Sequence, residues 1–392
     1  MAKKKLSFIS VILILIVGFS VGVAFDRIFL LNDNDTASLT SEQRKAINQA
    51  LNIVNQYAIE EHDQNFNVDY ALKGIAASLD DEYAYYYSAE ELEEFNKSTS
   101  GVVEKGIGIN FLQDEGKTVI VSVYKGLTAD AAGIKVGDVI KKINDVSVEG
   151  LATDEIAALA KQNDDTLMLE VEREGVLYTY LVNKTDGQRE MVEYKMLDNS
   201  ILYTKIISFR GNAVECFKKA LDFGVTNGYT GLIVDVRDNP GGELDTFAKI
   251  ADMLLPEGEL FYAKMRSGEK TSVKESDSKC INVPVCVLVN GSSASASEAF
   301  AGAMRCLSDT QIIGVKTYGK GIMQTTFTLA NGGAFKLTVG KYYLPNDECV
   351  HEVGITPDIV VELPEELNVK YWLLNQQNDL QLKKAIEVLT NN

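Results

Sequence analysis

The sequence predicts a multidomain protein of the α/β (α+β) class, with helical regions at both ends of the chain. A length of 392 residues is enough for two or three domains, each with its own core. Apolar residues recur with helical spacing over residues 36–100, with a period of two over residues 101–186, and in alternating strand and helix patterns over residues 187–363. A hydrophobic share of 46% and a charged share of 24% argue against extensive disorder. The formal net charge of −18 argues against nucleic acid as a partner.

Residues 1–35 are predicted to hold a cytoplasmic lysine stretch, a membrane anchor at about residues 6–25 and a polar spacer. The segment Leu6–Phe25 carries no charge and directly follows Lys3–Lys5. Its length spans a bilayer as a helix, and the lysines are expected to stay in the cytoplasm. The chain would then cross the cell membrane once and fold on its extracytoplasmic side. A cleaved signal peptide, with Gly22–Ala24 as the cleavage region, is the alternative, and the protein would then be secreted.

The N-terminal region, residues 36–100, is predicted to be helical. An apolar helical periodicity begins at Ser41, a second one runs over Asp69–Leu79, and Ser88–Phe95 opens like a capped third helix. The tail, residues 364–392, is polar and also predicted to be helical.

Residues 101–186 are predicted to form a separate β-module, because the runs Thr118–Tyr124 and Thr166–Glu174 alternate or are wholly apolar. Residues 187–363 form the predicted α/β core. Its strands include Gly231–Asp238 and Val283–Val289, and a helix is expected over Glu298–Leu307.

Cysteine and histidine usage limits the chemistry of the chain. Five cysteines are too few for a disulfide framework and odd in number, although Cys280 and Cys286 are close enough in sequence to pair. Only two histidines, His62 and His351, are present, and no metal-binding motif is built from them. No metal or other cofactor is expected.

A serine-rich stretch, "NGSSASASEAFAGA", lies at residues 290–303. Its composition also fits a flexible linker, but a strand precedes it and a helix follows it. The first N–H groups of that helix lack intrahelical partners and lie at the positive end of its dipole. The turn is therefore suited to a developing anion.

Two further stretches are candidates for chemistry. "TYGKGIMQ" at residues 317–324 places Lys320 between two glycines, and "DVRDNPGG" at residues 235–242 ends a buried strand in a glycine turn. Each by itself also fits an ordinary turn, with a solvated lysine in the first case.

Together these three stretches resemble the C-terminal (tail-specific) processing peptidase family. The resemblance implies that Ser295 is the nucleophile, Lys320 its general base and Gln324 the amide that supports the lysine. The spacing between Ser295 and Lys320 matches the family's pattern, and that of the neighbouring serines does not. Ser297 is expected to cap the helix instead.

The resemblance also implies the oxyanion hole. One donor is the N–H of Ala296, the residue after the nucleophile. The second is the N–H of Gly241 by the family's pattern, with Gly242 as the alternative. A lysine with its ordinary pKa of ~10.4 is protonated at neutral pH, so Lys320 must be desolvated to act as a base. Bringing that pKa to neutrality corresponds to about 4 kcal/mol.

The β-module is similar to PDZ domains, on the evidence of "GIGINF" at residues 106–111 and "AAGIKVGDVIKKIND" at residues 131–145. A PDZ domain adds a C-terminal peptide as a strand and binds its carboxylate on loop amides, here within Gly106, Ile107, Gly108 and Ile109. Ile107, Ile109 and Phe111 are expected to line the groove, so proteins or peptides with apolar C-termini are the expected partners. A dinucleotide-binding glycine motif is excluded because Phe111 takes the place of its third glycine.

The resemblance extends from about residue 40 to residue 363. It implies a crotonase/ClpP-like ββα peptidase core with an inserted PDZ domain, and a homodimer formed through the helical ends. The expected function is a membrane-anchored serine endopeptidase that cleaves exported proteins near their C-termini. A catalytically silent PDZ scaffold, an acyl-CoA enzyme and a Ser-His-Asp triad using His351 are the alternatives.

Overall fold

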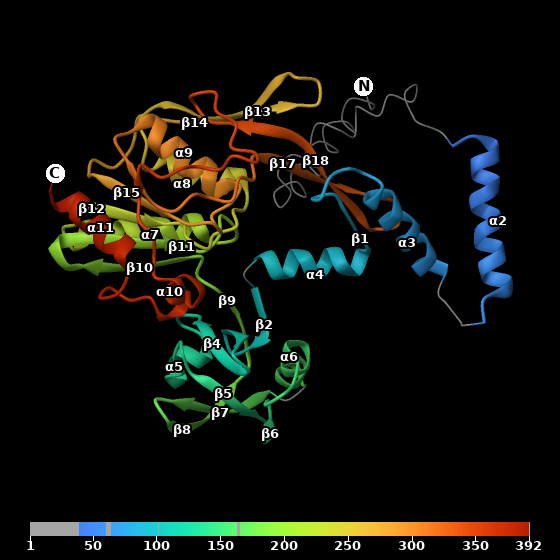
Figure 1. The fold of residues 1–392 in the computed structure, drawn as a ribbon, viewed down its shortest axis with the longest axis horizontal. Helices are drawn as coiled ribbons and strands as arrows, with labels where there is room; N and C mark the ends of the chain where they lie inside the picture. The colour runs from blue at the N-terminus through green and yellow to red at the C-terminus, as the bar shows by residue number, and fades with distance from the viewer. Residues whose placement is uncertain (1–38, 60–63, 101, 163–164, 392) are drawn as a thin grey trace, which may run out of the picture. The chain divides into compact units, whose positions relative to one another are not determined.

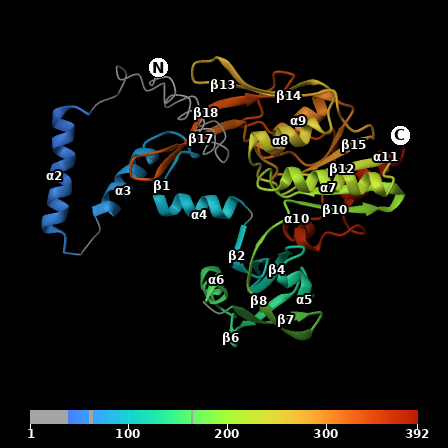
Figure 2. The ribbon, with the colours of Figure 1, turned by 180° about the vertical axis from the view of Figure 1, so that it is seen from behind.

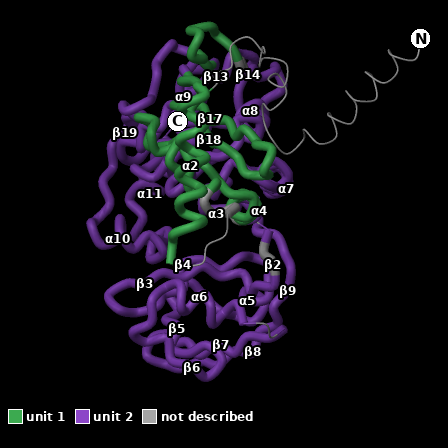
Figure 3. Tube along the Cα trace, turned by 90° about the vertical axis from the view of Figure 1, so that its right-hand side faces the viewer, with its two compact units in different colours: residues 1–96, 263–272, 322–342 green, residues 97–262, 273–321, 343–392 purple. Residues whose placement is uncertain are grey.

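The computed structural model describes residues 39–391 apart from residues 60–63, 101 and 163–164 (Figure 1). The predicted anchor at residues 6–25 lies outside the described residues. Within the described part of the chain, no helix has both the length and the apolar character needed to cross a membrane. The described residues form two compact units, which are coloured separately in Figure 3.

The first unit combines residues 39–96 with residues 263–272 and 322–342. It holds helices α2 (Ser41–Tyr57) and α3 (Gln64–Ala77), most of α4 (Ala89–Ser100) and strand β1 (Tyr85–Tyr87). The predicted N-terminal helices are confirmed. Thr40 caps α2, and Ser88 and Glu91 exchange hydrogen bonds at the start of α4.

Strands from far along the sequence complete this first unit. Strand β18 (Ala334–Tyr343) pairs antiparallel with β1 on one edge and with β17 (Ile322–Thr328) on the other. The sheet continues from β18 into β13 (Gly258–Met265) and β14 (Lys270–Ser276), of which residues 263–265 and 270–272 belong to this unit. Tyr86 of β1 is fully buried, and its hydroxyl donates to Asp69 at 2.6 Å. Helix α3 thus packs on β1, which is itself paired with a strand from much later in the sequence.

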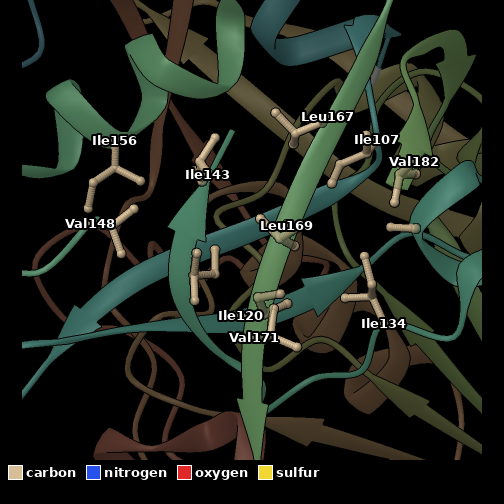
Figure 4. Close-up of a cluster of buried hydrophobic side chains, with 12 residues drawn as sticks. Ile107, Ile120, Ile134, Ile143, Val148, Ile156, Leu167, Leu169, Val171 and Val182 are labelled. Atoms are coloured by element: carbon tan, nitrogen blue, oxygen red, sulfur yellow. The ribbon is translucent and has the colours of Figure 1, made fainter. Parts of the chain in front are cut away.

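The second unit begins with the predicted β-module. Its five-stranded antiparallel sheet has the order β3-β4-β5-β7-β8, and short strand β6 pairs with β5. Strands β2 and β9 form a separate pair that leads into and out of the module. Apolar side chains of the sheet and of α6 form its core (Figure 4). The elements are β2 (Val102–Gly106), β3 (Ile109–Asp114), β4 (Lys117–Val123), α5 (Thr128–Ala132), β5 (Val139–Ile143), β6 (Val146–Ser147), α6 (Thr153–Lys161), β7 (Thr166–Arg173), β8 (Val176–Asn183) and β9 (Thr185–Gln188).

The rest of the second unit is built on a six-stranded sheet of order β10-β11-β12-β15-β16-β19, parallel from β11 onward. Its strands are β10 (Val192–Leu197), β11 (Ile201–Ile206), β12 (Gly231–Asp235), β15 (Val285–Val289), β16 (Gln311–Gly314) and β19 (Ile359–Val360). Every residue of β12 is buried, as expected for a parallel strand covered on both faces.

Helices cover this sheet, and they lie over and under it in Figures 1 and 2. C-terminal helix α11 (Leu380–Thr390) packs Leu382 and Ala385 against Ile233 of β12 and Leu288 of β15. The remaining helices are α7 (Ala213–Thr226), α8 (Leu244–Asp252), α9 (Ala296–Leu307) and α10 (Glu365–Val369). The predicted α/β core and helical tail are therefore present. The predicted pairing of Cys280 with Cys286 is wrong, because Cys286 is buried in β15, Cys280 is exposed and both thiols are free.

Candidate active site

The serine-rich stretch forms a sharp turn between buried strand β15 and helix α9. Ser295 is the N-cap of α9 and has φ 56° and ψ −118°, a conformation that costs energy in any residue with a side chain. Residues 296–304 behind it are all buried, so the helix is fixed in place. The turn presents the half-buried Ser295 at the positive end of the helix dipole, as the sequence predicts.

The four serines of this turn have different roles. Ser292 is exposed, whereas the buried Ser293 donates its hydroxyl to the Val236 carbonyl at 2.7 Å. Ser297 is buried in the first turn of α9 and donates to the Asn239 carbonyl at 2.9 Å. The prediction that Ser297 caps the helix is wrong, since Ser295 occupies the cap. Ser293 and Ser297 instead fasten the turn to the chain that follows β12.

A buried carboxylate joins the serine turn to the lysine segment. Oε2 of Glu298 accepts the N–H of Ser295 at 2.9 Å and the N–H of Lys320 at 2.8 Å. Oε1 accepts the Gly319 N–H at 2.7 Å and the Thr317 hydroxyl at 2.6 Å. The backbone nitrogens of Ser295 and Lys320 are therefore held by one oxygen atom.

Sequence reasoning missed this role of Glu298. The signal was present, because serine followed three residues later by glutamate is the pattern of a capping box. Such a box explains the bond to Ser295, but it carries no information about residues 317–320, which approach only in the folded chain.

The glycine after Lys320 allows a close approach of two chain segments. A Cβ atom on Gly321 would lie 2.3 Å from the backbone nitrogen of His351. No side chain fits there, so Gly321 brings residues 317–321 directly against the chain around His351. Lys320 is half-buried between Gly319 and Gly321, which are both buried.

Gln324 lies in strand β17 of the first compact unit, whereas Ser295 and Lys320 belong to the second. Its side-chain nitrogen donates to the Tyr83 carbonyl at 2.9 Å. The assignment of Gln324 as the amide that supports the lysine stays a prediction.

The chain after β12, residues 236–242, is called here the 236–242 arm, and it packs on the serine turn. A Cβ atom on Gly241 would lie 2.9 Å from the Ala296 nitrogen and 2.9 Å from the Ser295 Cβ, and φ at Gly241 is 102°. Only glycine permits this approach. The side chain of Asn290 in the serine turn exchanges two hydrogen bonds with Asp238, one to its backbone N–H and one to its carboxylate.

The two predicted oxyanion donors differ in the structure. No acceptor for the Ala296 N–H occurs among the described residues, so this group is available to a ligand. The Gly241 N–H donates to the Asn239 side chain at 2.9 Å. It would have to share or exchange that bond to stabilise an oxyanion, so the choice between Gly241 and Gly242 stays open.

A buried ion network lies at the start of the arm. Arg237 donates through Nε and Nη2 to the carboxylate of Asp235, and through Nη1 and Nη2 to that of Asp379. Burial raises the pKa of the Asp235 carboxyl, but the charge and hydrogen bonds of Arg237 outweigh this and hold that pKa below its ordinary value. The same two carboxylates keep the pKa of Arg237 above its usual range, against the effect of burial.

His351 does not have the surroundings of a catalytic histidine in a Ser-His-Asp triad. Its Nδ1 atom is buried and has no hydrogen-bond partner among the described residues. A triad histidine donates this proton to a carboxylate, which orients the ring. The described residues thus give His351 no carboxylate partner of the kind that a triad needs.

The predicted peptide site of the β-module is an open sheet edge. Among the described residues, strand β3 pairs only with β4, and the loop of residues 106–109 leads into it. The backbone carbonyls of Ile107 and Gly108 accept the amides of Ala129 and Tyr124, which fixes the loop. The prediction that Ile107 lines the groove is wrong, because its side chain is buried in the core of the module (Figure 4). Ile109 and Phe111 are half-buried and pack on that core from its edge.

Comparison with known proteins assigns the β-module and the core that follows it in the sequence. The family model described as peptidase family S41 matches residues 200–361, and the PDZ domain model matches residues 106–183. The carboxy-terminal processing protease CtpA of Bacillus subtilis (strain 168) is 33% identical over 339 residues, which are 86% of this chain and 72% of that protein. A probable CtpA-like serine protease of Staphylococcus aureus (strain MSSA476) is 30% identical over 383 residues, which are 95% of this chain and 75% of that protein.

Two solved structures share the fold. A photosystem II D1 C-terminal processing protease aligns with a TM-score of 0.51 and 23% identity, over 86% of this chain and 92% of its own. A putative S41 protease from Bacteroides fragilis NCTC 9343 aligns with a TM-score of 0.60 and 16% identity, over 88% and 97%. A parallel sheet that presents a serine at a strained strand-to-helix turn, joined to a PDZ domain, is the arrangement of a serine peptidase. The chain belongs to peptidase family S41.

Proposed function

We propose that this peptidase is anchored in the membrane, uses a Ser295/Lys320 dyad, and cleaves exported proteins near their C-termini. The observation that carries the dyad is Glu298, which holds the backbone amides of Ser295 and Lys320 on one oxygen atom. The strained conformation of Ser295 and the available Ala296 N–H support the same assignment.

In the proposed reaction, the neutral amine of Lys320 takes the proton of the Ser295 hydroxyl as its oxygen attacks the substrate carbonyl. The oxyanion accepts the Ala296 N–H and a second N–H from the 236–242 arm. Protonated Lys320 then gives its proton to the leaving amine. A water molecule, deprotonated by the same lysine, hydrolyses the acyl-enzyme and regenerates Ser295.

Substrate recruitment is proposed to use the free edge of β3. An extended C-terminal peptide would pair with this edge, and its carboxylate would accept amides of residues 106–109. Ile109 and Phe111 lie on this strand, which favours apolar C-terminal residues in the substrate. The names of the similar Bacillus and photosystem II proteases, which refer to processing at the carboxyl terminus, agree with this role.

The test is cleavage of an unstructured polypeptide ending in two valines by the full chain in detergent. We expect cleavage by the wild type and a loss of about 10⁴-fold or more in Ser295→Ala and Lys320→Ala, because nucleophile and base act as one unit. Binding of a fluorescent peptide with the same C-terminus should persist in both variants.

Activity that survives Lys320→Ala would contradict the dyad and point to His351. Peptide binding without cleavage by the wild type would favour the PDZ scaffold, and cleavage of an acyl-CoA thioester would favour the third alternative. The homodimer implied by the resemblance stays a prediction.

A further inference from the structure

The 236–242 arm is fastened at its start by the C-terminal segment of the chain. Asp379 accepts Nη1 of Arg237 on one oxygen at 3.1 Å and Nη2 on the other at 2.8 Å. Gln381 accepts Nη1 at 2.9 Å and donates its own amide to the Val361 carbonyl at 2.8 Å. The side chains of Arg237 and Asp379 are only 6% and 4% exposed. This is a two-pronged, desolvated pairing of guanidinium and carboxylate.

The arm leads from Arg237 directly to the proposed oxyanion hole. Asn239, two residues on, accepts the Ala294 amide on its carbonyl and the Gly241 amide on its side chain. Gly241 itself packs on Ser295 and Ala296. Residues 238–241 are therefore a short, hydrogen-bonded link between Arg237 and the N–H donors beside Ser295. A displacement of the Arg237 guanidinium would displace those donors as well.

The same C-terminal segment also forms part of a cavity of about 610 Å³ in this unit. Trp372, Asp379 and Leu382 line it on the tail side, and Arg237 and Asp238 line it at the start of the arm. Asn110 and Val123 of the PDZ domain line another wall. The tail, the arm and the PDZ domain thus all line one cavity of this unit.

We propose that Asp379, assisted by Gln381, is a positioning residue for catalysis: it holds Arg237 and thereby sets the 236–242 arm against Ser295. This inference rests on the proposed peptidase mechanism. Its physical basis is that an oxyanion donor must be fixed within a few tenths of an ångström before the reaction begins. Arg237 has one partner, Asp235, within β12 itself. Its other two partners, Asp379 and Gln381, belong to the C-terminal segment.

The variant Asp379→Asn separates this role from the structural one. Asp379 also caps α11, since its Oδ1 accepts the Leu382 amide at 3.0 Å. Asparagine caps a helix about as well as aspartate, so the variant keeps the cap. It removes the negative charge and replaces the oxygen that accepts Nη2 of Arg237 by an NH₂ group. Lys384→Met is the matched control, because it breaks an exposed ion pair with Glu387 on the same helix.

We expect Asp379→Asn to lower kcat about 10-fold or more with KM within twofold, and Lys384→Met to change neither. The inhibition constant of a peptide aldehyde, whose adduct with Ser295 places an oxyanion in the hole, should rise by the factor lost in kcat/KM. The proposal would be overturned if a folded Asp379→Asn variant had a kcat within twofold of the wild type. A variant whose kcat/KM falls only because KM rises would overturn it as well.

Hydrogen exchange measured by mass spectrometry provides a readout that does not depend on activity. Amides of residues 236–242 should exchange faster in Asp379→Asn than in the wild type or in Lys384→Met, and unchanged exchange would overturn the proposal. Hydrogen exchange tests the role of Asp379 even if the wild type cleaves nothing. A wild type without cleavage would contradict the proposed function and not this inference. If Asp379→Asn does not fold, Gln381→Met removes one hydrogen bond to Arg237 and should show a smaller change in the same direction.

Discussion

At the scale of single residues, Glu298 is the side chain on which the site depends most. Its two oxygens accept four hydrogen bonds from two separate chain segments, and it is fully buried. A carboxylate can accept all four, whereas a neutral amide has one oxygen and would turn its NH₂ group toward N–H donors.

Glu298→Gln should therefore lower kcat about 10²-fold and destabilise the fold by about 2 kcal/mol, because at least one buried donor loses its acceptor. Steady-state kinetics and urea unfolding measure the two effects. Glu348→Gln, which removes an exposed partner of Arg305, is the control. A Glu298→Gln enzyme with wild-type kcat would show that Glu298 does not position the dyad.

At the scale of elements, the end of β12 combines a fully buried strand with the buried ion network of Arg237. The pKa of Asp235 lies below its ordinary value of 3.8. The unfolded chain therefore binds a proton at Asp235 before the folded chain does as the pH falls. The stabilisation that this group provides is complete above about pH 4 and is lost as the pH falls through its lower, folded-state pKa.

Asp235→Asn should thus be less stable than the wild type by about 1–3 kcal/mol at neutral pH. This difference should stay constant down to about pH 4 and shrink only below it. Urea unfolding between pH 7 and pH 3 measures it, with Asp245→Asn, from an exposed pair with Lys274, as the control. A difference that already shrinks between pH 7 and pH 5, or that does not shrink at pH 3, would contradict the direction of the pKa shift.

At the scale of the whole molecule, the prediction concerns the membrane anchor at about residues 6–25. An anchor is predicted because the uncharged segment Leu6–Phe25 directly follows Lys3–Lys5. Signal cleavage near Ala24 would remove this segment and leave a soluble enzyme.

For an uncleaved anchor, full-length protein expressed in bacterial cells should sediment with membranes and resist extraction at high pH. Its peptidase part should be digested by a protease added to spheroplasts. Replacing Leu13 and Ile14 by lysine should release the protein from the membrane, because each lysine costs roughly 3 kcal/mol at a helix centre. A wild-type protein that begins after Ala24 by N-terminal sequencing would establish the cleaved signal peptide.

The sequence by itself determined the β-module, the α/β core and the serine turn, because these depend on local periodicity and on residues close together in the chain. Ser295, Lys320 and the PDZ loop were assigned from short motifs that resemble those of a known family, and their roles stay predictions. The tertiary structure decided which segments, far apart in the sequence, contact one another. It assigned Ser297 to the 236–242 arm instead of the helix cap, and it buried Ile107 in the PDZ core. It also brought Glu298 to Lys320 and Asp379 to Arg237, since buried charges take their partners from whichever segments the fold places beside them.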